Sequence, residues 1–153
     1  MEPATNMQKY ENYKGQMTRL KKALGAKFYL EAIFIEQNIL EDRVESILRH
    51  SNKYNPKKHN KLDNKLSKLE EMQREKNGLV RKYISDELIC KMYGWKKSRN
   101  DVVHALVKYN FSTADLSEIA ERGHNIVKEL NNKVSCYNRR IDRDNAKKEM
   151  PYV

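Results

Sequence analysis

The sequence predicts an all-α protein, a helical bundle of about five to six helices arranged up and down. The 153-residue chain contains only 5 Gly and 3 Pro, which leaves little turn chemistry for a multi-stranded sheet. Its apolar residues recur at three- and four-residue steps, the period of an amphipathic helix. A chain of this length can bury the core of one domain without disulfides. We therefore expect a single domain over residues 1–138, followed by a basic, flexible tail over residues 139–153.

The first two helices follow from apolar spacing. The first is predicted over about residues 7–24, where Tyr10, Met17 and Leu24 share one face, and Gly25 ends it. The second is predicted over about residues 26–48 and is the most hydrophobic element, which places it at the centre of the bundle. We assign its acidic residues to its polar side; these are Glu36, Glu41, Asp42 and Glu45.

A turn-rich stretch, residues 50–56, separates two helical hairpins. The helix after it has a narrow apolar stripe, which predicts shallow burial or contact with a partner. Its basic face could follow an RNA backbone, but we interpret it as a solvated surface. The stripe consists of Leu62, Leu66, Leu69 and Met72, and the basic face of Lys57, Lys58, Lys61, Lys65 and Lys68.

The second half of the chain contains further helix boundaries. Ser85 resembles a capping residue, because the acids Asp86 and Glu87 follow it in the first turn. Residues 94–98 predict a break before the next helix, and residues 111–113 predict another before a long final helix. Within this region we expect Trp95 to anchor the core or a dimer, and Cys90 and Cys136 to be small buried hydrophobes.

The charge and the cysteines limit the function classes. The formal net charge of +10, from 31 Lys and Arg against 21 Asp and Glu, suits a polyanion such as RNA, DNA or an acidic protein; lysine-rich solvated helices are the alternative. No apolar stretch approaches the roughly 20 residues of a membrane span. Two isolated cysteines and the absence of a leader favour a cytoplasmic protein, and no Cys/His cluster indicates a metal or a cofactor.

Candidate chemistry is concentrated in residues 98–107. Ser98 and Asp101 precede an apolar run with the spacing of a capping box, which predicts a helix start with Arg99 in its first turn. The unpaired backbone N–H groups of such a helix end, together with Arg99, would bind a phosphate-sized anion. Asn100 and His104 are four residues apart and share a helix face, and an imidazole with apolar neighbours can serve as a general base or acid.

The segment Arg99-Asn100-Asp101-Val102-Val103-His104 resembles the R-x(4–6)-H signature of the HEPN superfamily, in which a polar residue such as Asn commonly follows the arginine. The order of elements is also similar over about residues 26–137, with a Trp-containing helix before the motif and a long helix after it. The HEPN toxins that are paired with nucleotidyltransferase antitoxins resemble R-x(4)-H-x-Tyr. Here Leu106 stands at the tyrosine position, which argues against modification of that site by a partner.

The resemblance implies a HEPN-like helical bundle that forms a homodimer, with two copies of Arg99, Asn100 and His104 facing each other across a cleft. It implies metal-independent cleavage of single-stranded RNA that leaves a cyclic phosphate. By the same resemblance His104 handles the proton of the ribose 2′-hydroxyl, Arg99 steadies the scissile phosphate and Asn100 orients one or both.

The neighbouring Lys96, Lys97 and Ser98 are candidate RNA contacts, and the alternative is that they form an exposed helix boundary. The predicted protein is a toxin or an antiphage-defence ribonuclease, which an antitoxin or another protein partner could silence by covering the cleft. The alternative function is a noncatalytic HEPN-like adaptor that binds RNA or protein.

Overall fold

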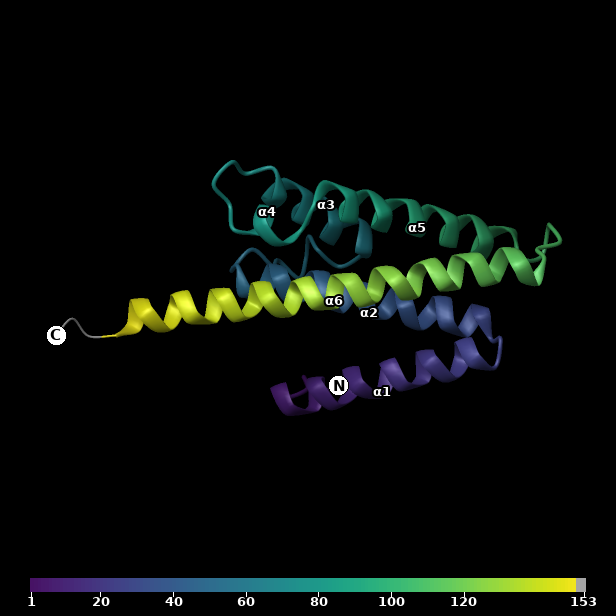
Figure 1. Ribbon diagram of the computed structural model, residues 1–153, viewed down its shortest axis with the longest axis horizontal. Helices are drawn as coiled ribbons and strands as arrows, with labels where there is room; N and C mark the ends of the chain where they lie inside the picture. The colour runs from purple at the N-terminus through teal and green to yellow at the C-terminus, as the bar shows by residue number, and fades with distance from the viewer. Residues whose placement is uncertain (151–153) are drawn as a thin grey trace. The chain divides into compact units, whose positions relative to one another are not determined.

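The computed structural model describes residues 1–150, and these residues form helices and no strand. The prediction of an all-α protein is confirmed. Tyr152 and the rest of residues 151–153, the end of the predicted tail, lie outside the described residues. The helices are α1 (Asn6–Gly25), α2 (Tyr29–His50), α3 (Leu62–Gln73), α4 (Val80–Tyr83), α5 (Asp86–Ala105) and α6 (Thr113–Glu149) (Figure 1).

The chain forms two compact units, to both of which α2, α5 and α6 contribute. Unit 1 comprises Met1–Ile39 and Trp95–Asn125, and unit 2 comprises Leu40–Gly94 and the chain from Ile126 onward. The candidate residues Arg99, Asn100 and His104 therefore belong to unit 1.

Unit 1 begins with a hairpin of α1 and the first half of α2, which run in opposite directions (Figure 1). Thr5 caps α1: its Oγ1 accepts a hydrogen bond from the Gln8 backbone N–H, and the Gln8 side chain accepts one from the Thr5 N–H. Lys27 makes the turn between the helices with a φ of 62°. The unit buries apolar residues of every helix that enters it, chiefly Leu20, Ala23, Ala32, Ile33, Ile35, Ile39, Trp95, Val102, Ile119 and Ala120.

Unit 2 buries the apolar stripe of α3. Leu66 and Leu69 are fully buried, and Leu62 and Met72 are nearly so; the prediction of shallow burial is therefore wrong. The predicted solvated face is wrong at one position too, because Lys65 is buried and its Nζ lies 3.3 Å from Glu45 Oε1 of α2. This ion pair compensates the buried ammonium group and allows so charged a helix to enter a core.

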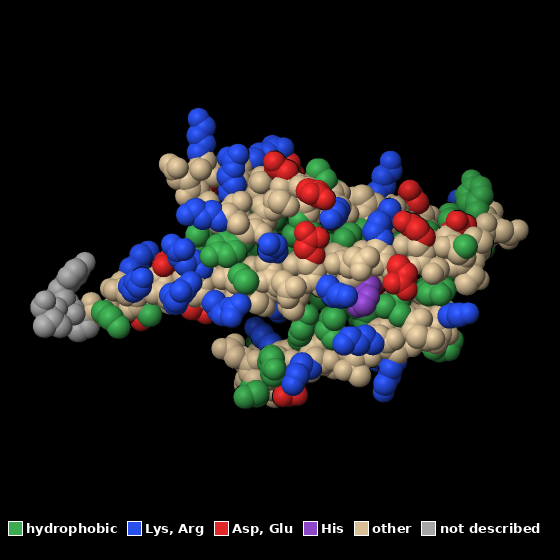
Figure 2. Space-filling model, viewed as in Figure 1, with side chains coloured by type: hydrophobic (Ala, Val, Ile, Leu, Met, Phe, Trp, Pro, Cys, Tyr) green, Lys and Arg blue, Asp and Glu red, His purple; other side chains and the backbone are tan. Residues whose placement is uncertain are grey.

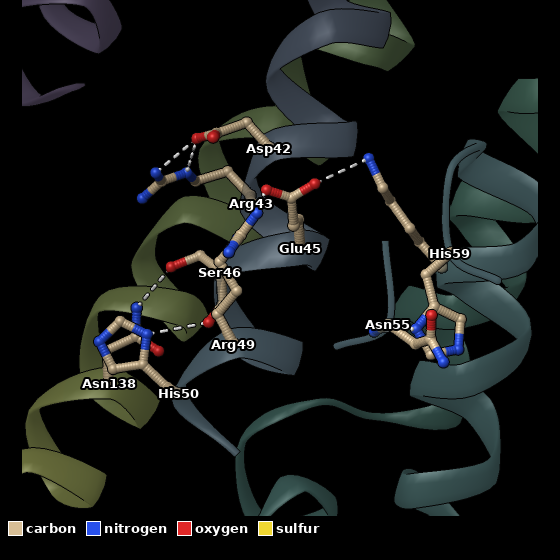
Figure 3. A network of polar contacts seen from close by, with 10 residues as sticks. Asp42, Arg43, Glu45, Ser46, Arg49, His50, Asn55, His59 and Asn138 are labelled. Atoms are coloured by element: carbon tan, nitrogen blue, oxygen red, sulfur yellow. Dashed lines mark hydrogen bonds and ion pairs between the residues drawn. The ribbon is translucent and has the colours of Figure 1, made fainter. Parts of the chain in front are cut away.

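The last turns of α2 hold a network of polar contacts within unit 2 (Figure 3). Glu45 accepts a hydrogen bond of 2.9 Å from Arg49 Nε. Ser46 accepts one of 2.9 Å from Asn138 Nδ2 of α6, and the ring of His50 lies 2.9 Å from the Ser46 carbonyl oxygen. In the loop after α2, His59 Nδ1 accepts a hydrogen bond of 2.9 Å from the Asn55 backbone N–H. Both histidines therefore hold positions in the local backbone structure of unit 2.

The expectation that Cys90 and Cys136 are buried is wrong, because both are exposed. Not every apolar side chain of the second predicted helix is in the core: Phe34, and Phe28 just before α2, are each 62% exposed. Most of the predicted tail is helical, since α6 continues to Glu149.

The continuation of α6 has a physical basis in its last turns. Arg140 Nε lies 3.2 Å from Asp144 Oδ1, four residues later on the same helix face. Lys147 and Lys148 occupy the final turn, where cations interact favourably with the helix dipole. Among residues 1–150, no helix combines the length and the apolar character that crossing a membrane requires.

Candidate functional site

The candidate motif lies in the second half of α5 and not at the start of a helix. This helix runs from Asp86 to Ala105 without interruption, so the predicted break at residues 94–98 is wrong. Its cap is Ser85, whose Oγ accepts a hydrogen bond of 3.1 Å from the Leu88 N–H, as predicted. A capping box does form at Ser112 and Asp115, before α6, where each side chain accepts from the other's backbone N–H.

This placement removes the predicted anion site of backbone N–H groups, because these groups are bonded within a continuous helix. Arg99 lies in the second half of α5 rather than in a first turn. His104 lies in the last turn of α5, where the helix dipole favours a cation.

Ser98 faces α6 instead of capping a helix. Its Oγ accepts a hydrogen bond of 2.5 Å from Arg122 Nη2, and Arg122 Nη1 also lies 3.5 Å from Glu118. All three residues belong to unit 1. The side chain of Ser98 thus connects two helices of this unit, and its position gives no support to a role in binding RNA.

The structure brings Arg99 and Asn100 together. Arg99 Nη1 donates a hydrogen bond of 3.0 Å to Asn100 Oδ1, and Arg99 Nε is buried without a hydrogen-bond partner among residues 1–150. His104 is exposed, one turn beyond Asn100 on the same face of α5. His104 follows Arg99 by five positions along the helix, a rotation of about 140° at 100° per residue. Within one chain, Asn100 therefore lies between the Arg99 guanidinium and the His104 imidazole on the surface of α5.

The two lysines lie on neighbouring parts of the same helix surface. Lys97 is exposed and precedes His104 by two turns, so the two residues are within about 20° of each other around α5. Lys96 is half-buried and lies one turn before Arg99 and Asn100. Of the residues predicted to contact RNA, these two share the surface of the motif and Ser98 does not.

The rotation of α5 is fixed by buried residues on its opposite side. Trp95 is fully buried, and its Nε1 donates a hydrogen bond of 3.1 Å to the Ile119 carbonyl oxygen of α6. Val102, two turns later, is 2% exposed. With this side of the helix in the core of unit 1, Asn100 and His104 face outward. The predicted role of Trp95 as a core anchor is confirmed.

Sequence analysis missed a buried carboxyl group beside this anchor. Glu36, assigned to the polar side of its helix, is fully buried, and neither carboxyl oxygen has a hydrogen-bond partner among residues 1–150. It is packed against Gly123 of α6, where an added Cβ would lie 2.2 Å from Glu36 Oε1 and 2.5 Å from Trp95 Nε1. Burial, and to a lesser degree the charge of Glu121, raise the pKa of Glu36 to about 9.

Glu36 is therefore protonated and uncharged at neutral pH. The sequence did contain a signal for its burial: Glu36 lies between Ile33 and Ile39 in the apolar stripe of α2, so its position has the period of the core. Its role in the described residues is to fill the space between α2, Trp95 and Gly123, beneath the helix that carries the motif.

Among residues 1–150, no three His, Cys, Asp or Glu side chains are grouped so that they could hold a metal ion. No protein-family model, curated protein or solved structure matches the chain.

Proposed function

We propose that the protein is an endoribonuclease that cleaves single-stranded RNA without a catalytic metal ion and works as a homodimer, in the role of a toxin or a defence protein. The observation that carries the proposal is the Arg99–Asn100 hydrogen bond of 3.0 Å with the exposed His104 one turn further along α5. A guanidinium, an amide and an imidazole on one short stretch of helix are the groups that a reaction at a phosphodiester requires.

The chemistry follows from the substrate. RNA contains its own nucleophile, the ribose 2′-hydroxyl, so a nucleophile generated on a metal ion is not needed. His104 takes the proton of this hydroxyl as the 2′-oxygen attacks the adjacent phosphorus. The phosphorus–O5′ bond breaks, the leaving oxygen takes up a proton, and the products end in a 2′,3′-cyclic phosphate and a 5′-hydroxyl. Arg99 stabilises the charge that develops on the phosphate oxygens, and Asn100 orients Arg99.

A second copy of the chain would complete this site. The rotation of about 140° between Arg99 and His104 separates them on one helix, and a two-fold axis near Asn100 would bring each imidazole toward the other copy's guanidinium. The surface around the motif suits such an interface, because large apolar side chains there are exposed. They are Val103, Leu106, Val107 and Tyr109, with exposed fractions of 43%, 41%, 100% and 69%.

The test is cleavage of a labelled single-stranded RNA in the presence of EDTA. We expect Arg99→Ala and His104→Ala to lower the rate on the order of 10²- to 10⁴-fold, the usual contribution of a general acid or base. Arg19→Ala is the matched control, since Arg19 is an exposed arginine of α1 in the same unit and outside the motif. Equal rates for all three variants, or no cleavage by the wild type on a broad set of RNAs, would reject the enzyme.

A noncatalytic adaptor is the second candidate function. The observation in its favour is a groove of about 550 Å³ in unit 1, with the exposed Phe28 and Leu30 and the half-buried Leu116 in its lining. An apolar groove of this size fits a side chain or a short segment of a protein partner. In that case the purified protein would bind its partner without cutting RNA, and Phe28→Ser would weaken binding while His104→Ala would not.

A further inference from the structure

Unit 2 contains a groove that the proposed active site does not use. It has a volume of about 660 Å³ and is lined by Tyr83 of α4 and by Cys136, Arg139, Asp142 and Arg143 of α6. The close approach of α4 to α6 creates it: the Tyr83 and Tyr137 rings meet edge to face, with centroids 5.9 Å apart. We call it the α6 groove.

The α6 groove lies on a basic surface. Lys and Arg side chains gather along the C-terminal half of α6, at the left of Figure 2. Arg139 and Arg143 are one turn apart on the same face, and both are exposed. Arg81 and Lys82, the two residues before Tyr83 in α4, are exposed as well, although they do not line the groove.

The acidic residues of the region offset part of this charge. Asp144 pairs with Arg140, at 3.2 Å, rather than with an arginine of the groove. Asp142 is the acidic residue of the lining, and its Oδ1 lies 3.8 Å from His50 Nε2. Arg139 Nε donates a hydrogen bond of 3.3 Å to the Ser135 carbonyl oxygen of its own helix, a contact that does not neutralise the charge of Arg139.

We propose that the α6 groove binds the phosphate backbone of single-stranded RNA, as a second contact surface apart from the cleavage motif. Two arginines one helical turn apart can each bind a phosphate, and an aromatic side chain at the edge of the groove can stack on a base. The choice of RNA over another polyanion rests on the proposed function. The groove would hold the substrate and set the overall affinity, while the residues of α5 cut it.

The first test is the salt dependence of RNA binding, measured by fluorescence anisotropy with a labelled single-stranded RNA. The protein carries His104→Ala throughout, so that binding is measured without cleavage. Adding Arg139→Gln and Arg143→Gln removes two phosphate contacts, which should lower the slope of log affinity against log salt by about 1.4 and weaken binding roughly 10- to 30-fold near 0.1 M salt. Far-UV circular dichroism shows whether the helices persist.

The matched control neutralises the same number of charges elsewhere. Lys21 and Lys22 are exposed on α1, in unit 1, and Lys21→Gln with Lys22→Gln should change affinity and slope much less. If the control pair weakens binding as much as the groove pair, the attraction comes from net charge and the groove proposal is wrong.

The second test uses the exposed thiols of the unaltered groove. Cys136 lines the α6 groove and Cys90 of α5 does not, and both are exposed. Saturating RNA should slow the alkylation of Cys136 at least several-fold and leave that of Cys90 unchanged. Equal protection of both thiols, or of neither, would overturn the proposal.

The two tests separate this proposal from the proposed function. RNA binding that needs Arg139 and Arg143, in a protein that cuts no RNA, supports the groove and rejects the nuclease. If Arg139→Gln with Arg143→Gln binds RNA normally in the His104→Ala protein and cuts RNA normally when His104 is present, the groove is rejected and the nuclease is left intact. If Arg139→Gln with Arg143→Gln abolishes binding to vesicles of anionic lipid and leaves the affinity for RNA unchanged, the groove binds a membrane surface and its role in binding RNA is overturned.

Discussion

The buried carboxyl group of Glu36 allows a prediction of how stability depends on pH. In the folded protein the pKa of Glu36 is raised from 4.5 to about 9, chiefly because burial disfavours the charged form. Between these two values the folded state holds a proton that the unfolded state has lost, so the free energy of unfolding falls as the pH rises. Below about pH 4.5 the Glu36 carboxyl is protonated in both states and adds nothing to the pH dependence of the free energy of unfolding.

The magnitude follows from the same values. Each pH unit within this window costs about 1.4 kcal/mol for one group, so the free energy of unfolding should fall by about 3 kcal/mol between about pH 5.5 and about pH 8. This is a large share of the stability of an ordinary domain. Glu36→Gln keeps the shape of the side chain without its ionisation and should remove most of this pH dependence.

The assay is urea unfolding followed by far-UV circular dichroism at the two pH values. Subtracting the pH dependence of Glu36→Gln from that of the wild type isolates Glu36 from the titration of histidines. Glu31→Gln is the matched control, because Glu31 lies on the same helix and its side chain is 49% exposed. If the wild type and Glu36→Gln lose stability equally with rising pH, Glu36 is not held neutral in the fold and the reasoning is wrong.

Three further predictions concern packing and the site. Gly123→Ala should lower the free energy of unfolding by about 1–3 kcal/mol, because its Cβ would overlap the Glu36 carboxyl. Gly94→Ala places its Cβ in open space and should instead stabilise α5 by about 0.5–1 kcal/mol. Urea unfolding measures both values. Val107→Asp, at a fully exposed position, should convert dimers to monomers in sedimentation analysis and reduce RNA cleavage in parallel; dimers of unchanged stability would contradict the proposed interface. Asn100→Ala should lower the cleavage rate on the order of 10- to 100-fold by releasing Arg99, with little change in thermal unfolding; an unchanged rate would remove Asn100 from the site.

Much of the fold could be predicted from local patterns in the sequence. The end of α1 at Gly25 and the cap of α5 at Ser85 depend on residues adjacent to them in the chain, and both are confirmed. The start of α6 at Thr113 follows from Ser112 in the same way. Such signals are local and do not require knowledge of the packing.

The errors arise where distant residues determine the outcome. Ser98 and Asp101 have the spacing of a capping box, but Trp95 and Val102 are buried in unit 1 and the helix continues through this segment. Glu36 has a polar side chain at a core position, and its burial depends on the absence of a side chain at Gly123, far along the sequence. The period of the core marks the position of Glu36, but the space for its carboxyl group depends on Gly123, and the continuation of α5 past Ser98 depends on packing within unit 1.

The sequence offers the residues of the candidate site as a prediction, and the structure adds their geometry. The motif itself fixes the positions of Arg99, Asn100 and His104 along one helix. Three features depend instead on how α5 is rotated against α6 in unit 1. They are the hydrogen bond between Arg99 and Asn100, the contact of Ser98 with Arg122, and the outward direction of His104.

The claim that the ribose hydroxyl is the nucleophile at the Arg99, Asn100 and His104 site can be tested with a pair of oligonucleotides of one base sequence, one made of RNA and the other of DNA. In EDTA, the protein should cut the RNA strand into fragments that end in a cyclic phosphate and should leave the DNA strand whole even when it binds it, because DNA lacks the 2′-hydroxyl. Cleavage of the DNA strand, or RNA fragments with a 3′-hydroxyl end, would contradict the mechanism.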